Sequence, residues 1–544
     1  MNTTLLRSGL IIDGRGGPAF PGHVLLRGDR IDAVLREGDA TPEAARHVDA
    51  TGRVIAPGFI DMHSHADWQL PLDDHPELLS GMLEQGVTTV VGGNCGISPA
   101  PLRRETLGRL HDFASIARDR PFDYTWESFA EYLEQMEDRK PALNLAELVG
   151  HSTLRYAGSD VARGPMPVDE QSNCLDRLRQ SLEEGACGLS FGLGYDPGMY
   201  SSVEELQDFC HVAAEADATA TVHLKAYSRI SPCYPLTTPE AHNVRALREM
   251  LDVARRTGVR LQLSHFIFVG RRSWRSVDAC LEMVDAARRD GLDIMIDAFP
   301  YTCGNTTIHA PFPYWFLAAL PGAYRSRLAR MRLRVELELG FRLAGFVYSD
   351  FQVMDAGVEG LEELNGLTIA EIAREWKTPP FDAMLTLAER SKGATTMLFH
   401  SYSGGPEDER ALETVLGHEA CLFETDVIVK SGGHPNPAAL GTFPRILGPL
   451  VRDRRLFDLE TAVHRMTGAS ADRFGMSHRG VLASGKAADV VIFDAAQICD
   501  SPPEGKQRAG RSRGIGHVFI NGEHAVKAGV YQSGVRAGRV IRPV

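Results

Sequence analysis

Six side chains of the kinds that bind zinc stand at the ends of short apolar segments in this sequence. They are His63, His65, Cys95, His223, His265 and Asp426. Imidazole, thiolate and carboxylate are the ligand types that zinc takes in proteins, and a zinc with three protein ligands keeps one position open for water or substrate. A single histidine in such a place is more often structural. Six ligand-type residues at five segment ends instead predict a metal centre for hydrolysis.

The segments that carry these residues alternate with helical spacers through the middle of the chain. There are eight of them, at 59–65, 87–96, 143–151, 186–195, 219–225, 260–266, 293–301 and 420–426. Eight strand-then-helix units are the number in a TIM barrel, where the carboxyl ends of the strands meet on one face and active sites lie. An open doubly wound sheet is the alternative, but no Gly-x-Gly-x-x-Gly follows a strand. We predict an α/β fold with a TIM-like (β/α)8 barrel, in which His63 and His65 point to the same side of the first strand.

The two ends of the chain have a different character. Both read as short strands between turns, and Asn521-Gly522 has the composition of a hairpin turn. The stretch between the seventh and eighth segments is too long for one strand-to-helix connection and is rich in helical pattern. We therefore expect a small β-sandwich from both termini, a barrel in two parts, and a subdomain inserted near the barrel mouth. The predicted boundaries are 1–56 and 477–544 for the sandwich, 57–304 and 396–476 for the barrel, and 305–395 for the insert.

The composition of the chain indicates which binding partners and which cellular compartment to expect. The chain has 544 residues and a net charge of −13, which argues against nucleic-acid binding. No run approaches the ~20 apolar residues that a membrane span needs, and no signal-peptide core is visible. Nine cysteines without a paired framework favour a reducing, cytoplasmic location. We expect a small-molecule substrate, no nucleic acid and no membrane partner, and the sequence leaves a homo-oligomer open.

Several longer motifs resemble one protein family. They are APGFIDMHSH at 56–65, GVTTVVGGNCGIS at 86–98, GLGYDPGMY at 192–200, FPYTCGNT at 299–306, GTFPRILG at 441–448 and GVLASGKAADVVIFD at 480–494. Together they resemble the D-aminoacylase (N-acyl-D-amino-acid deacylase) branch of the amidohydrolase superfamily. The Gly-Asn-Cys-Gly piece is the most specific, because it separates this branch from relatives that use a carboxylated lysine. The fourth segment, ACGLSFGLGY, contains no lysine, in agreement.

The resemblance implies a zinc-dependent hydrolase of amide C–N bonds and a role for each residue. Cys95, His223 and His265 would hold a tight zinc, His63 and His65 a second and weaker metal position, and Asp426 would be the general base. Tyr195 matches a tyrosine that lies near the substrate in this branch. Lys225, two residues after His223, would share its face and contact a substrate carboxylate or the oxyanion.

The groups that hold the substrate carboxylate in this branch are altered here. Ile267 stands where the branch has a lysine, and Asn436 follows His434-Pro435 where it has an arginine. Phe299 replaces a tyrosine and Asn305 a serine of the same region. Asparagine cannot reproduce the bidentate charge recognition of arginine. We therefore predict a substrate that is less anionic or more apolar than a free N-acyl-D-amino acid.

Three other functions stay open from the sequence alone. A cyclic amide, ester or carbamate could be hydrolysed on the same scaffold with the same metal chemistry. A metal-dependent lyase would use the cation to stabilise an enolate. A non-catalytic scaffold is disfavoured because Cys95, His223, His265 and Asp426 are all retained.

Overall fold

All eight predicted segments contain a strand in the computed structural model, which describes residues 3–161, 164–235, 237–501 and 510–543. The strands are β6 (Phe59–Asp61), β7 (Val87–Gly92), β8 (Asn144–Glu147) with β9 (Val149–Gly150), β10 (Gly188–Gly192), β11 (Thr219–His223), β12 (Arg260–Leu263), β13 (Ile294–Ala298) and β17 (Cys421–Phe423). They pair in parallel in two sheets, one running β6-β7-β8 and the other β9-β10-β11-β12-β13-β17. Neighbours in space are therefore neighbours in sequence.

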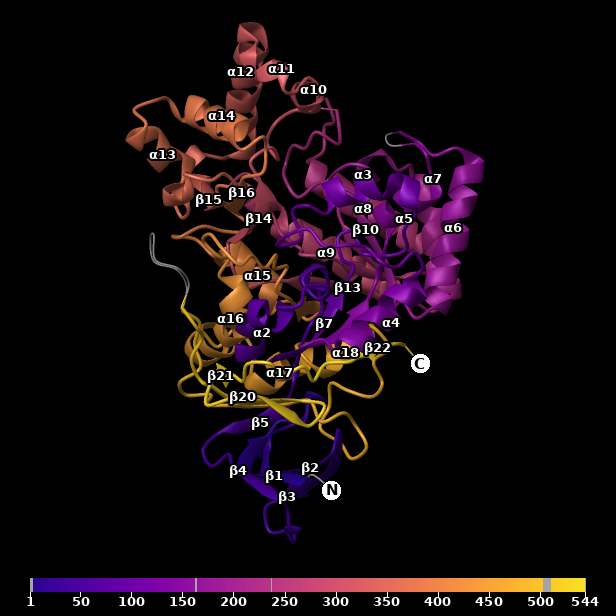
Figure 1. Ribbon diagram of the computed structural model, residues 1–544, viewed down its shortest axis with the longest axis vertical. Helices are drawn as coiled ribbons and strands as arrows, with labels where there is room; N and C mark the ends of the chain where they lie inside the picture. Colours follow the sequence, from indigo (N-terminus) through magenta and orange to yellow (C-terminus); the bar gives the residue numbers. More distant parts are fainter. Residues whose placement is uncertain (1–2, 162–163, 236, 502–509, 544) are drawn as a thin grey trace.

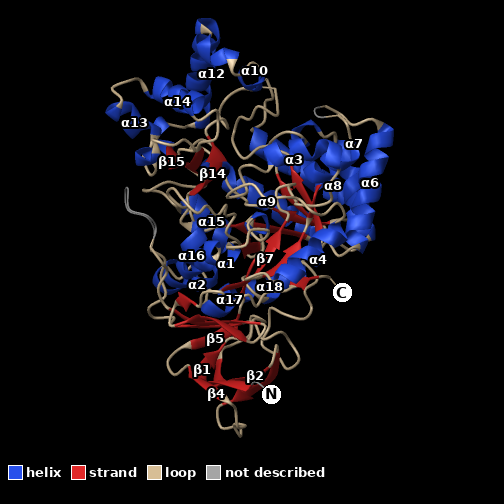
Figure 2. Ribbon diagram, viewed as in Figure 1, coloured by secondary structure: helices blue, strands red, loops and turns tan. Residues whose placement is uncertain are grey.

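Helices connect the parallel strands, as parallel pairing requires. They include α4 (Phe129–Arg139), α6 (Val168–Glu183), α7 (Val203–Glu215), α8 (His242–Thr257), α9 (Val277–Arg289) and α15 (Arg410–Gly417). In α8 one face buries Leu247, Met250 and Leu251, and Gly258, with a φ of 70°, caps the helix after its last residue, Thr257. Figure 2 shows the helices around the central strands. Helices cover the strands, which explains why the strands read as continuous apolar runs.

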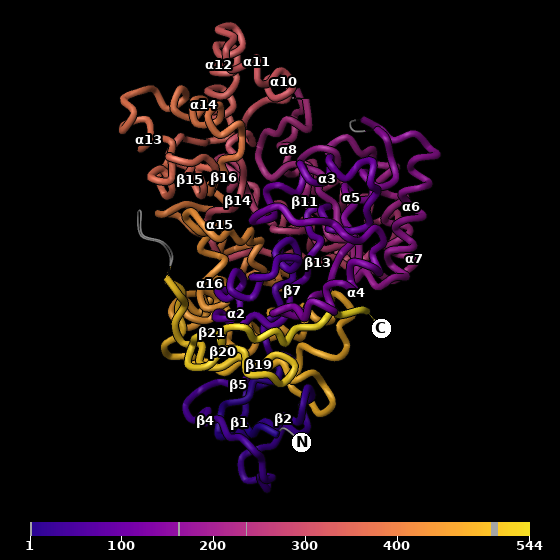
Figure 3. Tube along the Cα trace, viewed as in Figure 1, coloured from indigo at the N-terminus to yellow at the C-terminus, as the bar shows by residue number. Residues whose placement is uncertain are grey.

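Both ends of the chain contribute to one further sheet of nine strands. The N-terminal strands are β1 (Thr3–Ile11), β2 (Phe20–Arg27), β3 (Arg30–Arg36), β4 (Arg46–Asp49) and β5 (Val54–Pro57), and the C-terminal ones are β18 (Val490–Phe493), β19 (Ile515–Ile520), β20 (Glu523–Lys527) and β21 (Val530–Tyr531). Antiparallel pairing of β5 with β18 joins the two sets, and Figure 3 shows them in contact at one end of the molecule. The predicted turn at Asn521-Gly522 is confirmed, with φ of 47° and 81° between β19 and β20. The last strand, β22 (Val540–Ile541), leaves this sheet and pairs with β8.

The long stretch between β13 and β17 builds its own sheet and helices. β14 (Cys303–Thr307), β16 (Thr396–His400) and β15 (Phe351–Asp355) form an antiparallel sheet in that order. The helices are α10 (Tyr314–Ala318), α11 (Gly322–Arg325), α12 (Arg327–Ala344), α13 (Ile369–Glu375) and α14 (Pro380–Arg390). In Figure 1 this group lies at the end of the molecule opposite the nine-stranded sheet, with α12 at its tip. In the described part of the chain, no helix has the length and apolar character needed to cross a membrane.

Candidate metal centre

The strand ends bring the six predicted residues together. His223 is the last residue of β11, and the other five lie two to four residues beyond the ends of β6, β7, β12 and β17. Two groups of ligand atoms result, each with all its atoms within 4.8 Å of one another. One group is Cys95, His223 and His265, and the other is His63, His65, Cys95 and Asp426. The side chains that the sequence placed on five separate strands therefore form one cluster.

The first group has donors of the types that suit zinc. The Cys95 sulfur lies 3.8 Å from Nδ1 of His223 and 3.4 Å from Nε2 of His265. These two imidazole nitrogens are 2.9 Å apart. Two imidazoles and a thiolate are a three-ligand set that leaves the fourth position of a tetrahedral zinc free. The donor set fits a zinc ion.

The second group shares the cysteine with the first. The sulfur of Cys95 lies 3.3 Å from Nε2 of His63, and Oδ1 of Asp426 lies 3.5 Å from Nε2 of both His63 and His65. Cys95 therefore stands between the two groups. Asp426 is on the open side of the cluster, because its side chain is 19% exposed whereas that of His63 is 1% exposed.

Three of the cluster residues have left-handed backbone conformations. The φ angles are 55° for Cys95, 31° for His265 and 46° for Asp426. Such angles are unfavourable for residues with a Cβ, and they persist where surrounding contacts enforce them. Backbone contacts do so here: the Asp426 N–H donates to the His63 carbonyl at 3.0 Å, and the His265 N–H donates to Asp297 Oδ1 at 2.6 Å. Three of the six cluster residues therefore have an unfavourable backbone conformation that fixes the direction of the side chain.

Charges in the cluster favour ionised ligands. Burial by itself would raise the pKa of the Cys95 thiol, but His63 and His265 hold that pKa well below its ordinary value. Burial also opposes the charge of Asp426, yet His265 and His65 lower the pKa of this carboxyl. A thiolate and a carboxylate close together are ligands that suit a divalent cation such as zinc.

Two buried carboxyl groups behind His63 were missed by sequence reasoning. Asp297 Oδ1 lies 3.6 Å and Glu424 Oε2 3.5 Å from Nδ1 of His63, the nitrogen that faces away from Cys95. Asp297 also accepts the Gln262 amide at 2.7 Å. Burial raises the pKa of Glu424 well above its ordinary value. Partners of this kind fix the orientation of a ligating histidine. The available signal was a carboxylate inside an otherwise apolar strand, Asp297 in IMIDA.

Three other predicted site residues, Tyr195, Lys225 and Ile267, make different contacts around the cluster. The Tyr195 hydroxyl donates to the Cys95 carbonyl at 2.6 Å, and its ring lies 4.8 Å from that of His223. Lys225 donates from Nζ to the Ser201 carbonyl at 2.9 Å, so its amine is anchored on the backbone. Ile267 is buried in the apolar core just past His265.

Asn305 and Asn436 meet beside Asp426. The Asn436 amide donates to Asn305 Oδ1 at 3.1 Å across 131 residues of sequence. The Asn305 amide in turn lies 3.4 Å from the Asp426 carbonyl. Phe299 is buried nearby, with its ring 6.4 Å from that of Tyr402, whose phenol has a pKa raised by burial and by Asp426. Tyr402 is a further residue close to Asp426 and Phe299, and sequence reasoning did not find it.

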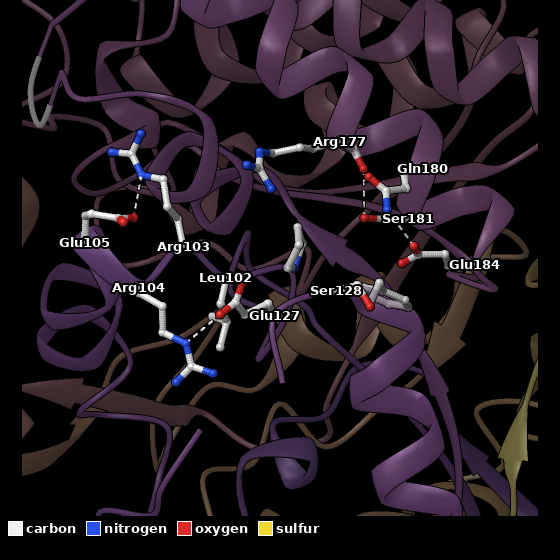
Figure 4. A pocket seen from close by; sticks show the side chains of 12 residues that line it. Leu102, Arg103, Arg104, Glu105, Glu127, Ser128, Arg177, Gln180, Ser181 and Glu184 are labelled. Atoms are coloured by element: carbon white, nitrogen blue, oxygen red, sulfur yellow. Dashed lines mark hydrogen bonds and ion pairs between the residues drawn. The ribbon is translucent and has the colours of Figure 1, made fainter. Parts of the chain in front are cut away.

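A surface cleft elsewhere is lined by none of the predicted site residues. Figure 4 shows it between the segment after Pro101 and helix α6. Its volume is about 380 Å³, and its charged groups are largely paired, with Arg104 bonded to Glu127 at 2.7 Å. Arg103 is paired with Asp160. The cluster at the strand ends therefore remains the candidate site.

Tyr195→Phe should weaken zinc binding without unfolding the protein. The hydroxyl holds the Cys95 carbonyl, and hence the left-handed turn that aims the sulfur. Loss of such a supporting bond typically costs about 10-fold to 100-fold in metal affinity. Competition for zinc against a chelator measures the effect. Tyr301→Phe is the matched control, because it removes a buried phenol that bonds Asp500 instead. Equal zinc retention in the two variants would contradict a supporting role of the Tyr195 hydroxyl in zinc binding.

Known proteins resemble this chain along nearly its whole length. A sequence profile of the amidohydrolase family matches residues 46–309 and 434–541. N-acyl-D-glutamate deacylase of Alcaligenes xylosoxydans xylosoxydans is 34% identical over 521 residues, which are 95% of this chain and 92% of that protein. The crystal structure of N-acyl-D-glutamate deacylase from Bordetella bronchiseptica, complexed with zinc and a phosphonate inhibitor that mimics the tetrahedral intermediate, has a TM-score of 0.79 at 28% identity and 99% coverage of both chains. A D-aminoacylase structure, from work on the role of its binuclear metal centre in one-metal activation and second-metal attenuation, has a TM-score of 0.76, also at 28% identity and 99% coverage of both chains.

Proposed function

The chain belongs to the D-aminoacylase family of the amidohydrolase superfamily, and we propose that it hydrolyses the amide bond of an N-acyl substrate less anionic than an N-acyl-D-amino acid. It is a zinc-dependent hydrolase acting on carbon–nitrogen bonds other than peptide bonds. The observation that carries the proposal is the group of Cys95, His223 and His265 with Asp426 on its open side.

We assign the tight zinc to Cys95, His223 and His265. A zinc ion held there supplies a Lewis acid that polarises the scissile carbonyl and lowers the pKa of water. The chain's own contribution is to aim the ligands, through the Tyr195 bond to Cys95 and the Asp297 bond to the His265 N–H. His63 and His65 would form a second, weaker position with Asp426. The binuclear metal centre of the related D-aminoacylase supports that assignment.

We assign Asp426 as the general base. Its carboxylate is held by the strained backbone at the end of β17, and His265 and His65 keep its pKa low. In this role Asp426 accepts a proton from the attacking water and later delivers it to the departing amine. The neighbouring side chains of His63 and His65 are buried, and burial strengthens their electrostatic interactions with Asp426.

We further propose that the two parallel sheets close into one eight-stranded barrel. Backbone bonds at both seams support closure: the Asp426 N–H donates to the His63 carbonyl at 3.0 Å, and the Cys187 N–H donates to the Glu147 carbonyl at 2.8 Å. The domain division into 1–56 with 477–544, 57–304 with 396–476, and the insert 305–395 is proposed with it. A cytoplasmic location is supported by the nine cysteines, none of which is paired in a disulfide in the described part of the chain.

The substrate proposal rests on the pair Asn305–Asn436. The two side-chain amides bond each other next to Asp426, and neither of them carries a charge. Ile267 adds an apolar side chain past His265. A carboxylate bound there would lose its hydration without gaining a bidentate cation. A neutral amide or ester in its place would meet matching hydrogen-bonding groups.

A matched substrate pair tests this proposal. N-acetyl-D-methionine and its carboxamide differ only in the charge of one group, and we expect kcat/KM to be at least about tenfold higher for the carboxamide. Asn436→Arg should raise kcat/KM for the free acid about tenfold and leave the carboxamide value nearly unchanged, because arginine restores bidentate recognition. Asn436→Gln is the control, since it keeps the amide and adds no charge.

Two results would count against the proposal. Wild-type turnover of N-acetyl-D-methionine or N-acetyl-D-glutamate at ~10⁴ M⁻¹s⁻¹ or more would show that the carboxylate is well recognised. Products formed in ¹⁸O-water without ¹⁸O in the new carboxylate would indicate a lyase in place of a hydrolase.

A further inference from the structure

Tyr402 lies where the chain returns from the inserted sheet to the barrel. It stands two residues past the end of β16 and is only partly buried. The rings of Tyr195 and Tyr227 lie against histidines of the metal cluster, and their hydroxyls donate to backbone carbonyls at 2.6 and 3.0 Å. In the described part of the chain, the Tyr402 hydroxyl has no such partner. It is therefore free to bind a group from outside the protein.

The backbone on both sides of Tyr402 is in the left-handed conformation. The φ angles are 78° at Ser401 and 55° at Ser403, which are unfavourable for residues with a Cβ. The Ser401 carbonyl accepts the Gly270 N–H at 3.0 Å. The Ser403 N–H donates to the Phe268 carbonyl at 2.9 Å. Strained residues held in this way fix the direction of the side chain between them, and such strain concentrates at ligand-binding sites.

Packing also fixes the ring of Tyr402. A Cβ at Gly304 would lie 2.3 Å from this ring, so the ring packs directly against the glycine. The next residue is Asn305, whose amide lies 3.4 Å from the Asp426 carbonyl. The centre of the Tyr402 ring is 6.4 Å from that of Phe299. The phenol is therefore held beside the segment that carries Phe299 and Asn305, close to the proposed base.

The surroundings keep this phenol a neutral hydrogen-bond donor. Burial and the Asp426 carboxylate raise the pKa of the Tyr402 phenol well above its ordinary value. A phenol that keeps its proton donates to a carbonyl oxygen, but it brings no positive charge with which to pair a carboxylate. Asn305 and Asn436 carry no charge either, and Asp426 repels an anion. A ligand group with a neutral carbonyl suits these groups best.

We propose that Tyr402 is a substrate-binding residue, whose hydroxyl donates a hydrogen bond to the carbonyl of the group that stands where an N-acyl amino acid has its carboxylate. The inference rests on the proposed hydrolysis of an N-acyl substrate and names a contact for the neutral end of that substrate. Because Tyr402 directly follows a strand of the inserted sheet, the insert takes part in substrate recognition. The contact lies away from the scissile bond, so it should affect substrate binding more than the chemical step.

Tyr402→Phe removes the hydroxyl and keeps the ring that packs against Gly304. With the carboxamide of N-acetyl-D-methionine as substrate, we expect KM to rise about fivefold to tenfold and kcat to stay within about twofold, because one hydrogen bond in the bound substrate is lost. Bound zinc should be unchanged, in contrast to Tyr195→Phe. Tyr348→Phe is the matched control, because it removes a phenol hydroxyl that bonds Glu338 at 3.2 Å elsewhere in the insert.

A truncated substrate shows whether the hydroxyl binds this particular group. N-acetyl-3-(methylthio)propylamine has the scissile amide and the side chain of the methionine substrate and lacks only the carboxamide. For this substrate, Tyr402→Phe and the wild type should have equal kcat/KM, because the hydroxyl has no acceptor to lose. An equal loss for both substrates, or no loss for either, would overturn the inference.

The same measurements separate this inference from the proposed function. A wild type that prefers the free acid to the carboxamide would overturn the substrate proposal, and a loss in Tyr402→Phe confined to substrates with the carbonyl would still support the contact. A wild type that prefers the carboxamide, with KM unchanged in Tyr402→Phe, would overturn the contact and leave the substrate proposal standing.

Discussion

Asp426→Asn is expected to lower kcat by about 10³-fold while the protein keeps its tightly bound zinc. Asparagine has the size of aspartate and can retain the backbone bond to the His63 carbonyl, but its amide cannot accept a proton. General acid–base catalysis by one positioned group contributes ~10²-fold to 10⁴-fold, so removal of the base should cost that much. Steady-state kinetics with the best substrate of the panel, together with zinc content by mass spectrometry, measures both parts.

Rescue by an added small carboxylate can show whether Asp426 acts as the general base or has only a structural role. Asp426→Ala leaves a space where the carboxylate stood, and added formate should restore part of the lost turnover. The same formate should not help Asp426→Asn, because the amide fills the space. Near-normal activity of Asp426→Asn, or loss of its zinc, would show that the proton passes through another group or that Asp426 mainly holds metal.

Cys95→Ala is expected to release the tight zinc and with it nearly all activity. The sulfur is the one donor that both groups of ligand atoms share, so its removal takes a ligand from each. We expect zinc affinity to fall by about 100-fold or more, which exceeds the usual effect of a residue that only supports a ligand. Zinc retained after dialysis against a chelator gives the result directly.

Another buried cysteine controls for the loss of a thiol. Cys187 is buried, and burial keeps its pKa well above the ordinary value, so it should be an inert thiol. Cys187→Ala should keep zinc and activity, with a small loss of thermal stability from the lost packing. If Cys95→Ala kept its zinc as firmly as Cys187→Ala, the tight site would have to lie elsewhere among the histidines.

The two variants also separate the two halves of the proposed centre. Asp426→Asn should be inactive with zinc, and Cys95→Ala inactive without it. The arrangement of the ligand atoms leads to this contrast, because Cys95 lies between the imidazoles whereas Asp426 lies on the more exposed side. A single structural defect would instead lower zinc content and stability in both.

Much of the fold was predictable from the local pattern of apolar and polar residues. Each of the eight apolar segments formed a strand, because a short apolar run followed by a helical spacer can bury both faces only inside a parallel sheet. The positions of His63, Cys95, His223 and Asp426 near strand ends followed from that pattern, and so did the turn at Asn521-Gly522, whose residue types tolerate positive φ. Local sequence determines which face a side chain takes and where a strand stops.

The tertiary structure decided what these residues meet. Sequence pattern could not show that the Cys95 sulfur lies between two sets of histidines, or that Glu424 and Asp297 stand behind His63. Nor could it show that Asn436 bonds Asn305 across 131 residues, or that β22 leaves the terminal sheet for β8. Such contacts join distant parts of the chain, and they depend on how whole strands and helices pack, which no local periodicity encodes. The sequence by itself determined a set of ligand types at the ends of parallel strands, and only the packing of those strands brought them into one cluster, with the uncharged Asn305 and Asn436 beside it.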